Sequence, residues 1–265
     1  MPYQTLVPEG AYSLLENQRQ AFVEGKLPKI ADAVIKSVPI EESGEKIVDI
    51  RTLPTPRIAM MPDPKTPSGP PDCNAGSPES SMVRGTVYKK LEAMVDELDK
   101  LAPTFGFQKG QVAIRVYEGL RSLETQREVF DDKVREIQAA HPEFTHETCI
   151  EEASKWVSPV KNNVPAHSTG AAIDIRLYDL HTNTYIDMGK FGVIWGENPH
   201  APTFSEGLTP EQRHHRTFLL MAAASVGLVN YPFEWWHFST GDRYAAYWLK
   251  HQKAVYGSVV LPSKL

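Results

Sequence analysis

The sequence predicts an α+β fold in which a small, mainly antiparallel sheet is flanked by helices. Amphipathic stretches of helical length alternate irregularly with short strands, without the regular β-α-β order that a parallel sheet requires. The chain has 265 residues, of which 41% are hydrophobic and 23% charged. This ordinary balance supports a fold around one main core.

The first 84 residues are predicted to form an extension packed on the core. Apolar positions at helical spacing in residues 10–38 are interrupted near Gly25 and Pro28, which predicts two short helices. A strand is expected at residues 47–50. Residues 53–80 are rich in Pro, Gly, Ser and Asp and predict a long surface loop, a candidate wall for a binding pocket.

Residues 85–265 are predicted to form the main domain. Apolar residues on one helical face predict a helix at 87–101, and a period-2 pattern predicts a strand at 112–117 that ends just before Arg121. Two further amphipathic helices follow, one from Leu123 to Ile137 and one that includes Ile150 and Trp156.

The last third of the chain contributes two more strands and a helix. Ile173, Ile175 and Leu177 alternate with polar residues and predict a strand. Residues 209–212 (TPEQ) combine a cap, a proline at the first helical position and a capping-box glutamine, and Gly227 ends that helix. An aromatic strand is expected at residues 233–238.

The net charge of the chain and its N-terminal sequence limit the kinds of partner that we expect the protein to bind. The net charge is −5, and no run of Lys or Arg forms a basic stripe, which argues against a nucleic-acid or anionic-membrane partner. The N-terminus lacks a basic segment followed by an apolar one, and no stretch is long and apolar enough to span a bilayer. We therefore expect a cytoplasmic protein.

Residues 167–174 (HSTGAAID) form the first segment that carries chemistry. Glycine permits a tight bend, after which a strand returns the carboxylate of Asp174 beside the imidazole of His167. Neutral imidazole and carboxylate are ordinary zinc ligands.

A second segment, residues 234–238 (EWWHF), supplies the imidazole of His237 and the carboxylate of Glu234. A catalytic zinc commonly has three protein ligands and an open position for water, whose proton a nearby carboxylate accepts. These roles fit His167, Asp174 and His237 as ligands of one Zn²⁺ and Glu234 as the acid/base. Residues at i and i+3 do not share a face of a regular strand, so this hypothesis requires a bulge or turn.

Taken singly, these residues have plainer interpretations. An isolated His is usually a hydrogen-bonded surface or core group, and an Asp beside a bend is often a cap. The aromatic neighbours of Glu234 fit packing better than catalysis. Arg121 can orient a substrate or stabilise an oxyanion, but an ordinary surface arginine fits equally well.

Together the motifs resemble the zinc D-alanyl-D-alanine dipeptidases of the vancomycin-resistance type. HSTGAAID is similar to the first metal motif of that family and EWWHF to the second. The similarity extends through residues 118–121 (EGLR), 187–189 (DMG) and 230–233 (NYPF), and covers roughly residues 85–250 in the family's order. The chain departs from the family at Pro165-Ala166, where the family has serine, and at Leu120 and Ser122 beside the arginine.

The resemblance implies a fold related to the Hedgehog signalling domain and the D,D-carboxypeptidases. It implies His167, Asp174 and His237 as zinc ligands, Glu234 as the catalytic carboxylate and Arg121 as the group that stabilises the tetrahedral intermediate. Residues 85–265 would then be the zinc peptidase domain.

The expected reaction is zinc-dependent hydrolysis of a small peptide, with D-Ala-D-Ala as the leading substrate. Two alternatives remain: a D,D-carboxypeptidase or endopeptidase acting on longer cell-wall peptides, and a non-hydrolytic zinc-binding protein of the same fold.

Overall fold

The computed structural model describes residues 4–53, 55–61, 79–154, 157–192 and 198–261. Its strands are β1 (Ile47–Asp49), β2 (Ile58–Met60), β3 (Met82–Arg84), β4 (Val112–Glu118), β5 (Ala172–Asp179), β6 (Thr184–Tyr185), β7 (Val229–Tyr231) and β8 (Glu234–Ser239). Its α-helices are α1 (Glu9–Val23), α2 (Ala33–Lys36), α3 (Gly85–Leu101), α4 (Leu123–Ala140), α5 (His146–Ala153), α6 (Pro210–Ser225) and α7 (Arg243–Trp248).

The main sheet has the strand order β2-β4-β5-β8-β7, with β6 paired to the edge of β5. All its pairs are antiparallel except β2 with β4. Strands β1 and β3 form a separate antiparallel pair. The expected α+β class with a mainly antiparallel sheet is confirmed.

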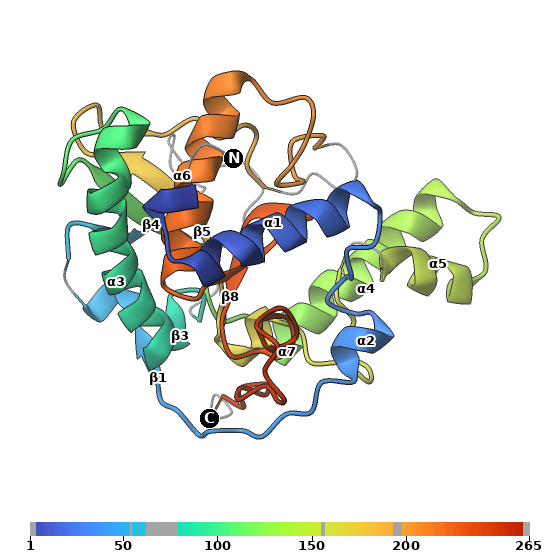
Figure 1. Cartoon of the computed structure of the whole chain (residues 1–265). Helices are drawn as coiled ribbons and strands as arrows, with labels where there is room; N and C mark the ends of the chain where they lie inside the picture. Colours follow the sequence, from blue (N-terminus) through green and yellow to red (C-terminus); the bar gives the residue numbers. More distant parts are fainter. Residues whose placement is uncertain (1–3, 54, 62–78, 155–156, 193–197, 262–265) are drawn as a thin grey trace.

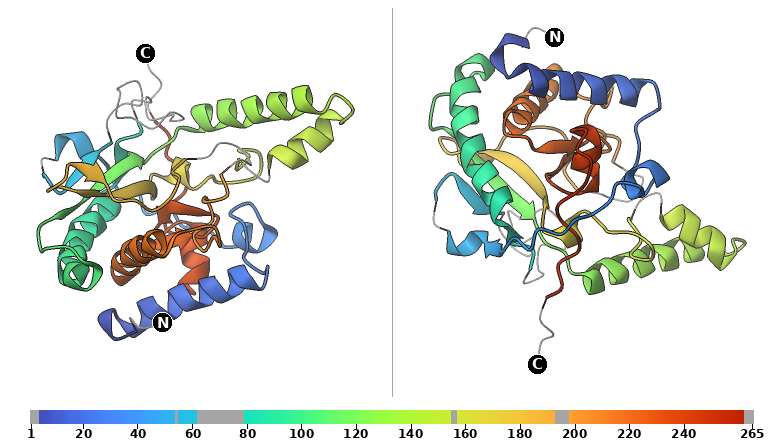
Figure 2. Two further views of the ribbon diagram at one scale, coloured as in Figure 1. Left: turned by 90° about the horizontal axis from the view of Figure 1, so that it is seen from above. Right: turned by 60° about the horizontal axis from the view of Figure 1, so that its bottom comes forward.

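Helices α1, α3 and α6 cover one face of the sheet, while α4 and α5 project from the body as a helical hairpin (Figures 1 and 2). The covered face holds the core because alternate residues of the central strands point into it, among them the fully buried Ile114, Val116, Ile173 and Ile175. The predicted helix at 87–101 corresponds to α3, which buries Val87, Leu91, Met94, Leu98 and Leu101 against this face.

Helix boundaries follow the capping signals in the sequence. Thr209 and Gln212 form the expected capping box at the start of α6. Gly227 takes a left-handed backbone conformation (φ 72°) just after the helix, as its predicted stop requires. Within the described ranges, no helix combines the length and the apolar character needed to cross a bilayer.

The predicted loop at residues 53–80 is partly wrong. Residues 58–60 form β2, which runs parallel to β4, with Ile58 opposite Ile114. Three residues are too few to display a strand period, so this pairing depends on partners distant in sequence. Residues 62–78 of that loop and Trp156 of the predicted third helix lie outside the described residues.

The first 84 residues share the core of the rest of the chain. Val7, Ala11, Leu15 and Ile50 belong to the same buried cluster as the residues of α3, β4 and β5. Helix α1 packs along α6 (Figure 1). Residues on both sides of position 84 therefore contribute to one buried cluster.

Candidate active site

A tight turn after a short 3-10 helix at His167–Thr169 places the first candidate ligand. Gly170 closes the turn in a left-handed conformation (φ 68°), where a Cβ atom would lie 2.9 Å from the side chain of Ile47. The chain then enters β5 and reaches Asp174. As the sequence predicted, the bend returns the carboxylate to the imidazole of His167.

The sheet register brings in the third candidate ligand. Asp174 of β5 pairs directly with His237 of the antiparallel strand β8. Directly opposite residues on neighbouring strands have side chains about 4.5–5.5 Å apart at Cβ. Two segments more than sixty residues apart in sequence therefore meet at one point of the sheet.

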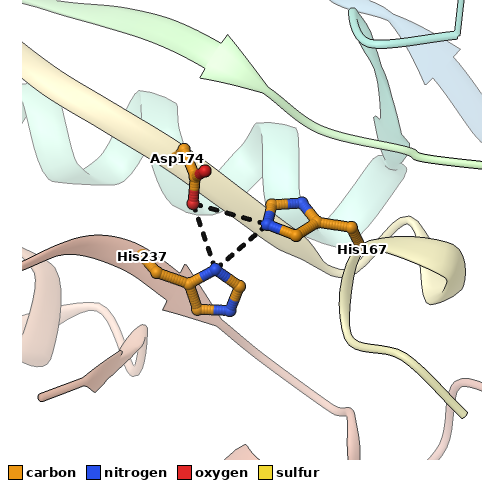
Figure 3. Close-up of side chains that lie close together, drawn as sticks. All are labelled: His167, Asp174 and His237. Atoms are coloured by element: carbon orange, nitrogen blue, oxygen red, sulfur yellow. Dashed lines mark hydrogen bonds and ion pairs between the residues drawn. The ribbon is translucent and has the colours of Figure 1, made fainter. Parts of the chain in front are cut away.

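Three polar atoms converge there (Figure 3). Nδ1 of His237 lies 3.0 Å from Nε2 of His167 and 3.0 Å from Oδ1 of Asp174, and Nε2 of His167 lies 3.4 Å from the same Oδ1. All three residues are buried, with exposed fractions of 8% for His167, 5% for Asp174 and 3% for His237. The two imidazoles and the carboxylate thus form a small, water-shielded triangle.

The triangle has the dimensions of one face of a zinc coordination tetrahedron. With zinc bonds of about 2.0–2.1 Å, neighbouring ligand atoms of a tetrahedral site lie about 3.3 Å apart. The observed separations of 3.0, 3.0 and 3.4 Å match this value closely. The donor set of two nitrogens and one carboxylate oxygen also suits zinc.

Protonation states favour a cation at this point. Nδ1–H of His167 donates to the carbonyl oxygen of Gly119 at 2.8 Å, so Nε2 is the ring nitrogen that faces the triangle. Burial raises the pKa of Asp174, but the two imidazoles lower it further, and the net pKa lies well below its ordinary value. An ionised carboxylate and an imidazole lone pair are the forms that bind a metal.

Glu234 reaches the triangle through an irregularity in β8. The β7–β8 register shifts between Asn230 and Tyr231, whose partners are Phe238 and Glu234, so the intervening part of β8 departs from regular pairing. Oε2 of Glu234 lies 3.9 Å from Nδ1 of His237. The irregularity that the hypothesis required is therefore present.

The environment of Glu234 suits proton transfer. Burial raises the pKa of its carboxyl above the ordinary value, against the opposing effect of His237. The side chain is still 27% exposed, which leaves it accessible from the cavity. A carboxylate with a raised pKa near a candidate metal site fits a general acid/base better than a fourth ligand.

Arg121 lies just after β4, the strand that pairs with β5 on the edge opposite β8. Its guanidinium forms a two-pronged ion pair with Glu118, through Nε at 2.7 Å and through Nη2, and its Nη1 donates to Gln126 at 3.0 Å. Burial lowers the pKa of Arg121, but the attraction of Glu118 outweighs it and raises the net pKa. The plain interpretation as a surface arginine is excluded, since the side chain is only 16% exposed.

One cavity of about 170 Å³ is lined by all five residues that the sequence singled out. Its walls also include residues that the sequence did not single out for the site, namely Lys29, Ile30, Ala31, Tyr117, Gln126, Ser158, Tyr231 and Trp236. None of the described residues of the predicted wall at 53–80 lines it; residues 29–31 of the extension do. Trp235, Trp236 and Phe238 are buried, as packing residues are.

Most of the additional lining residues carry no local signal. Glu118 belongs to the EGLR motif at the end of a predicted strand, so its position beside Arg121 could have been predicted. A bulge between Val116 and Glu118 sets Glu118 opposite Asp174. Residues 29–31 line the cavity because of how the N-terminal extension folds back on the sheet, which no pattern in the sequence predicts.

Comparison with known proteins identifies the class. Residues 92–254 match the family described as D-ala-D-ala dipeptidase, more than half of the chain. The chain belongs to this family, and it is a metallopeptidase.

Particular relatives agree with this assignment. A D-alanyl-D-alanine dipeptidase of Synechocystis is 28% identical over 250 residues, which cover 84% of this chain and 95% of the relative. The dipeptidase of Enterococcus faecalis is 32% identical over 77 residues, 29% of this chain and 37% of the relative.

Two solved structures are also similar. VanYB in complex with D-Alanine-D-Alanine is 19% identical, with a TM-score of 0.37, over 65% of this chain and 80% of that one. The LdcB LD-carboxypeptidase is 15% identical, with a TM-score of 0.40, over 81% of this chain and 76% of that one.

Proposed function

We propose that this protein hydrolyses short peptides with a single bound zinc ion, and that D-Ala-D-Ala is its leading substrate. The observation that carries the proposal is the convergence of His167, Asp174 and His237 at zinc-like separations in one small cavity. Glu234 and Arg121 line the same cavity.

The chemistry divides between the metal and the chain. His167, Asp174 and His237 would hold the zinc ion, which when bound would supply a Lewis acid for a carbonyl oxygen and lower the pKa of water. Glu234 accepts the proton of the attacking water and delivers it to the amine that leaves. Arg121, held in place by Glu118, stabilises the negative charge that develops on the carbonyl oxygen.

Two observations favour a dipeptide over a longer peptide. The cavity of about 170 Å³ is smaller than the ~300–1,000 Å³ typical of pockets for drug-sized ligands. The Synechocystis relative, which matches over 84% of this chain, is named a D-alanyl-D-alanine dipeptidase. The hydroxyl that the family carries before its first histidine is replaced here by Pro165-Ala166, so other groups must hold the substrate ends.

A substrate series tests the proposal. The zinc-loaded protein is assayed for kcat/KM on D-Ala-D-Ala, on its N-acetyl form and on a cell-wall pentapeptide. We expect the free dipeptide to be fastest, because burial of an added peptide group without a partner costs about 1–3 kcal/mol, or about ten- to a hundredfold in rate.

The other outcomes separate the alternatives. Faster cleavage of the pentapeptide would assign the protein as a D,D-carboxypeptidase or endopeptidase. Absence of cleavage of all three peptides by protein with zinc bound would identify a non-hydrolytic zinc-binding protein.

A further inference from the structure

The cavity contains few cations for a ligand that carries a free carboxylate. Among the cavity-lining residues, Lys29 and Arg121 are the basic side chains other than histidine. Asp174 and Glu234 line the same cavity and repel a negatively charged terminus. Apart from the proposed zinc ion, these two side chains are the cations among the described lining residues that can bind the carboxylate of a free dipeptide.

The guanidinium of Arg121 already donates hydrogen bonds to two neighbouring side chains. Its Nε and Nη2 donate to Glu118 and its Nη1 to Gln126, which leaves few donors free for a second carboxylate. The side chain of Glu118 is only 2% exposed, and its carboxylate offsets the charge of the neighbouring guanidinium. Arg121 is thus better suited to a small developing charge than to binding a full carboxylate.

Lys29 has a free ammonium group. Within the described part of the chain its Nζ forms no ion pair, and it lies over the ring of Phe233, 5.8 Å from the ring centroid. The carboxylate of Asp32 accepts a hydrogen bond from the backbone N–H of Lys29, at 2.8 Å. This backbone contact fixes the bend that carries Lys29 to the cavity wall.

Lys29 lies on the Glu234 side of the cavity. Phe233, whose ring lies under the Lys29 ammonium group, directly precedes Glu234 in the chain, and residues 29–31 line the cavity together with Tyr231. Tyr231 in turn pairs with Glu234 in the β7–β8 ladder and packs on the ring of His237, with 5.7 Å between centroids. Glu118 ends β4, Gln126 lies in α4, and Arg121 lies in the connection between them.

The direction of proton transfer then orients the substrate. Since Glu234 delivers its proton to the leaving amine, the leaving residue lies on the Glu234 side. The carboxylate of that residue is about one residue length, roughly 3.5 Å, from its amine. We infer that the ammonium group of Lys29 binds the C-terminal carboxylate of the dipeptide, so that the N-terminal extension selects substrates with a free carboxyl end.

This inference rests on the proposed function and is tested with Lys29→Met and Lys29→Arg. Methionine keeps an unbranched side chain but removes the charge, and arginine keeps the charge. Lys26→Met is the matched control, because Lys26 is in the same segment and pairs with Glu24 at 2.9 Å. Each variant is assayed on D-Ala-D-Ala and on its C-terminal amide, with zinc content measured alongside.

We expect Lys29→Met to raise KM for D-Ala-D-Ala by about tenfold or more, the scale of a hydrogen bond to a charged group, with little change in kcat. Lys29→Met should have no such effect on the amide, while Lys29→Arg and Lys26→Met should behave like the wild type.

An equal effect on acid and amide would make Lys29 a packing residue and overturn the inference, as would an unchanged KM. In both cases an active wild type leaves the proposed function standing. If the wild type with zinc bound fails to cleave D-Ala-D-Ala, the proposed function is rejected, and this inference with it.

Discussion

Nδ1 of His167 lies 2.8 Å from the carbonyl oxygen of Gly119, and this contact decides which nitrogen of the ring faces the site. A carbonyl only accepts, so Nδ1 carries a proton, and Nε2 is the nitrogen available to a metal when the ring is neutral. Gly119 is itself constrained, since a Cβ there would lie 2.5 Å from the carbonyl oxygen of Met82. Backbone packing between β3 and β4 thus orients a candidate ligand.

The first prediction concerns metal content. The purified protein should contain about one tightly bound zinc per chain, and His167→Ala or His237→Ala should lose it, because two remaining ligands hold zinc weakly. Elemental analysis after gel filtration measures this. His251→Ala, at an exposed histidine, is the control and should keep its zinc. Full zinc content in both ligand variants would refute the assignment.

A second prediction separates proton transfer from metal binding. Glu234→Gln should retain zinc, while kcat falls by roughly a hundredfold or more, the usual scale for a positioned acid/base. Steady-state kinetics combined with elemental analysis of the same preparation checks both parts. Near-normal turnover would remove Glu234 from the mechanism, and loss of zinc would make it a ligand.

Arg121 should act mainly in the transition state. Arg121→Ala is expected to lower kcat more than it raises KM, because a group that binds substrate and transition state equally affects KM alone. This is the opposite of the pattern expected for Lys29→Met. A pure KM effect of Arg121→Ala would make Arg121 a substrate anchor.

The extension and the main domain should unfold together. Arg84 connects three parts of the chain: its side chain donates to Glu42 at 3.1 Å, to the carbonyl oxygen of Thr169 at 2.9 Å and to that of Gly257 at 3.3 Å. Arg84→Met should lower the free energy of unfolding by about 3 kcal/mol, since it leaves buried acceptors unpaired.

Urea unfolding followed by tryptophan fluorescence and by circular dichroism tests this cooperativity. We expect one coincident transition in the wild type and in Arg84→Met. Two separate transitions would show that residues 1–84 are an independent unit.

A fifth prediction uses pH. Burial raises the pKa of Asp99, but hydrogen bonds from Arg57 and from the backbone of Gly110 lower it below its ordinary value of 3.8. Because the folded-state pKa is the lower one, the contribution of Asp99 to stability is present above pH 3.8 and is lost as pH falls through the folded-state pKa.

Asp99→Asn should therefore cost about 1–2 kcal/mol at pH 7, where the charged pair with Arg57 is intact. The difference from the wild type should shrink as the pH is lowered toward 3. Urea unfolding of both proteins across this range measures it, and a difference independent of pH would assign the cost to packing.

The chemical groups of the candidate site and their local geometry could be predicted from the sequence. Capping residues located the start of α6, apolar spacing located α3, and the spacing of His167, Gly170 and Asp174 predicted a turn followed by a strand. These signals are local, because each depends on residues within one or two turns of the chain.

The residues that surround the candidate site could be identified only from the folded structure. The strand β2 was missed because its three residues acquire strand geometry from the distant β4. Glu118 faces Asp174 because of a bulge in β4, and Lys29 lines the cavity because the extension passes beside Phe233. Such contacts join residues far apart in the chain, and no periodicity in the sequence encodes them. The candidate metal ligands stand in two motifs, whereas the walls of the cavity depend on how distant segments pack.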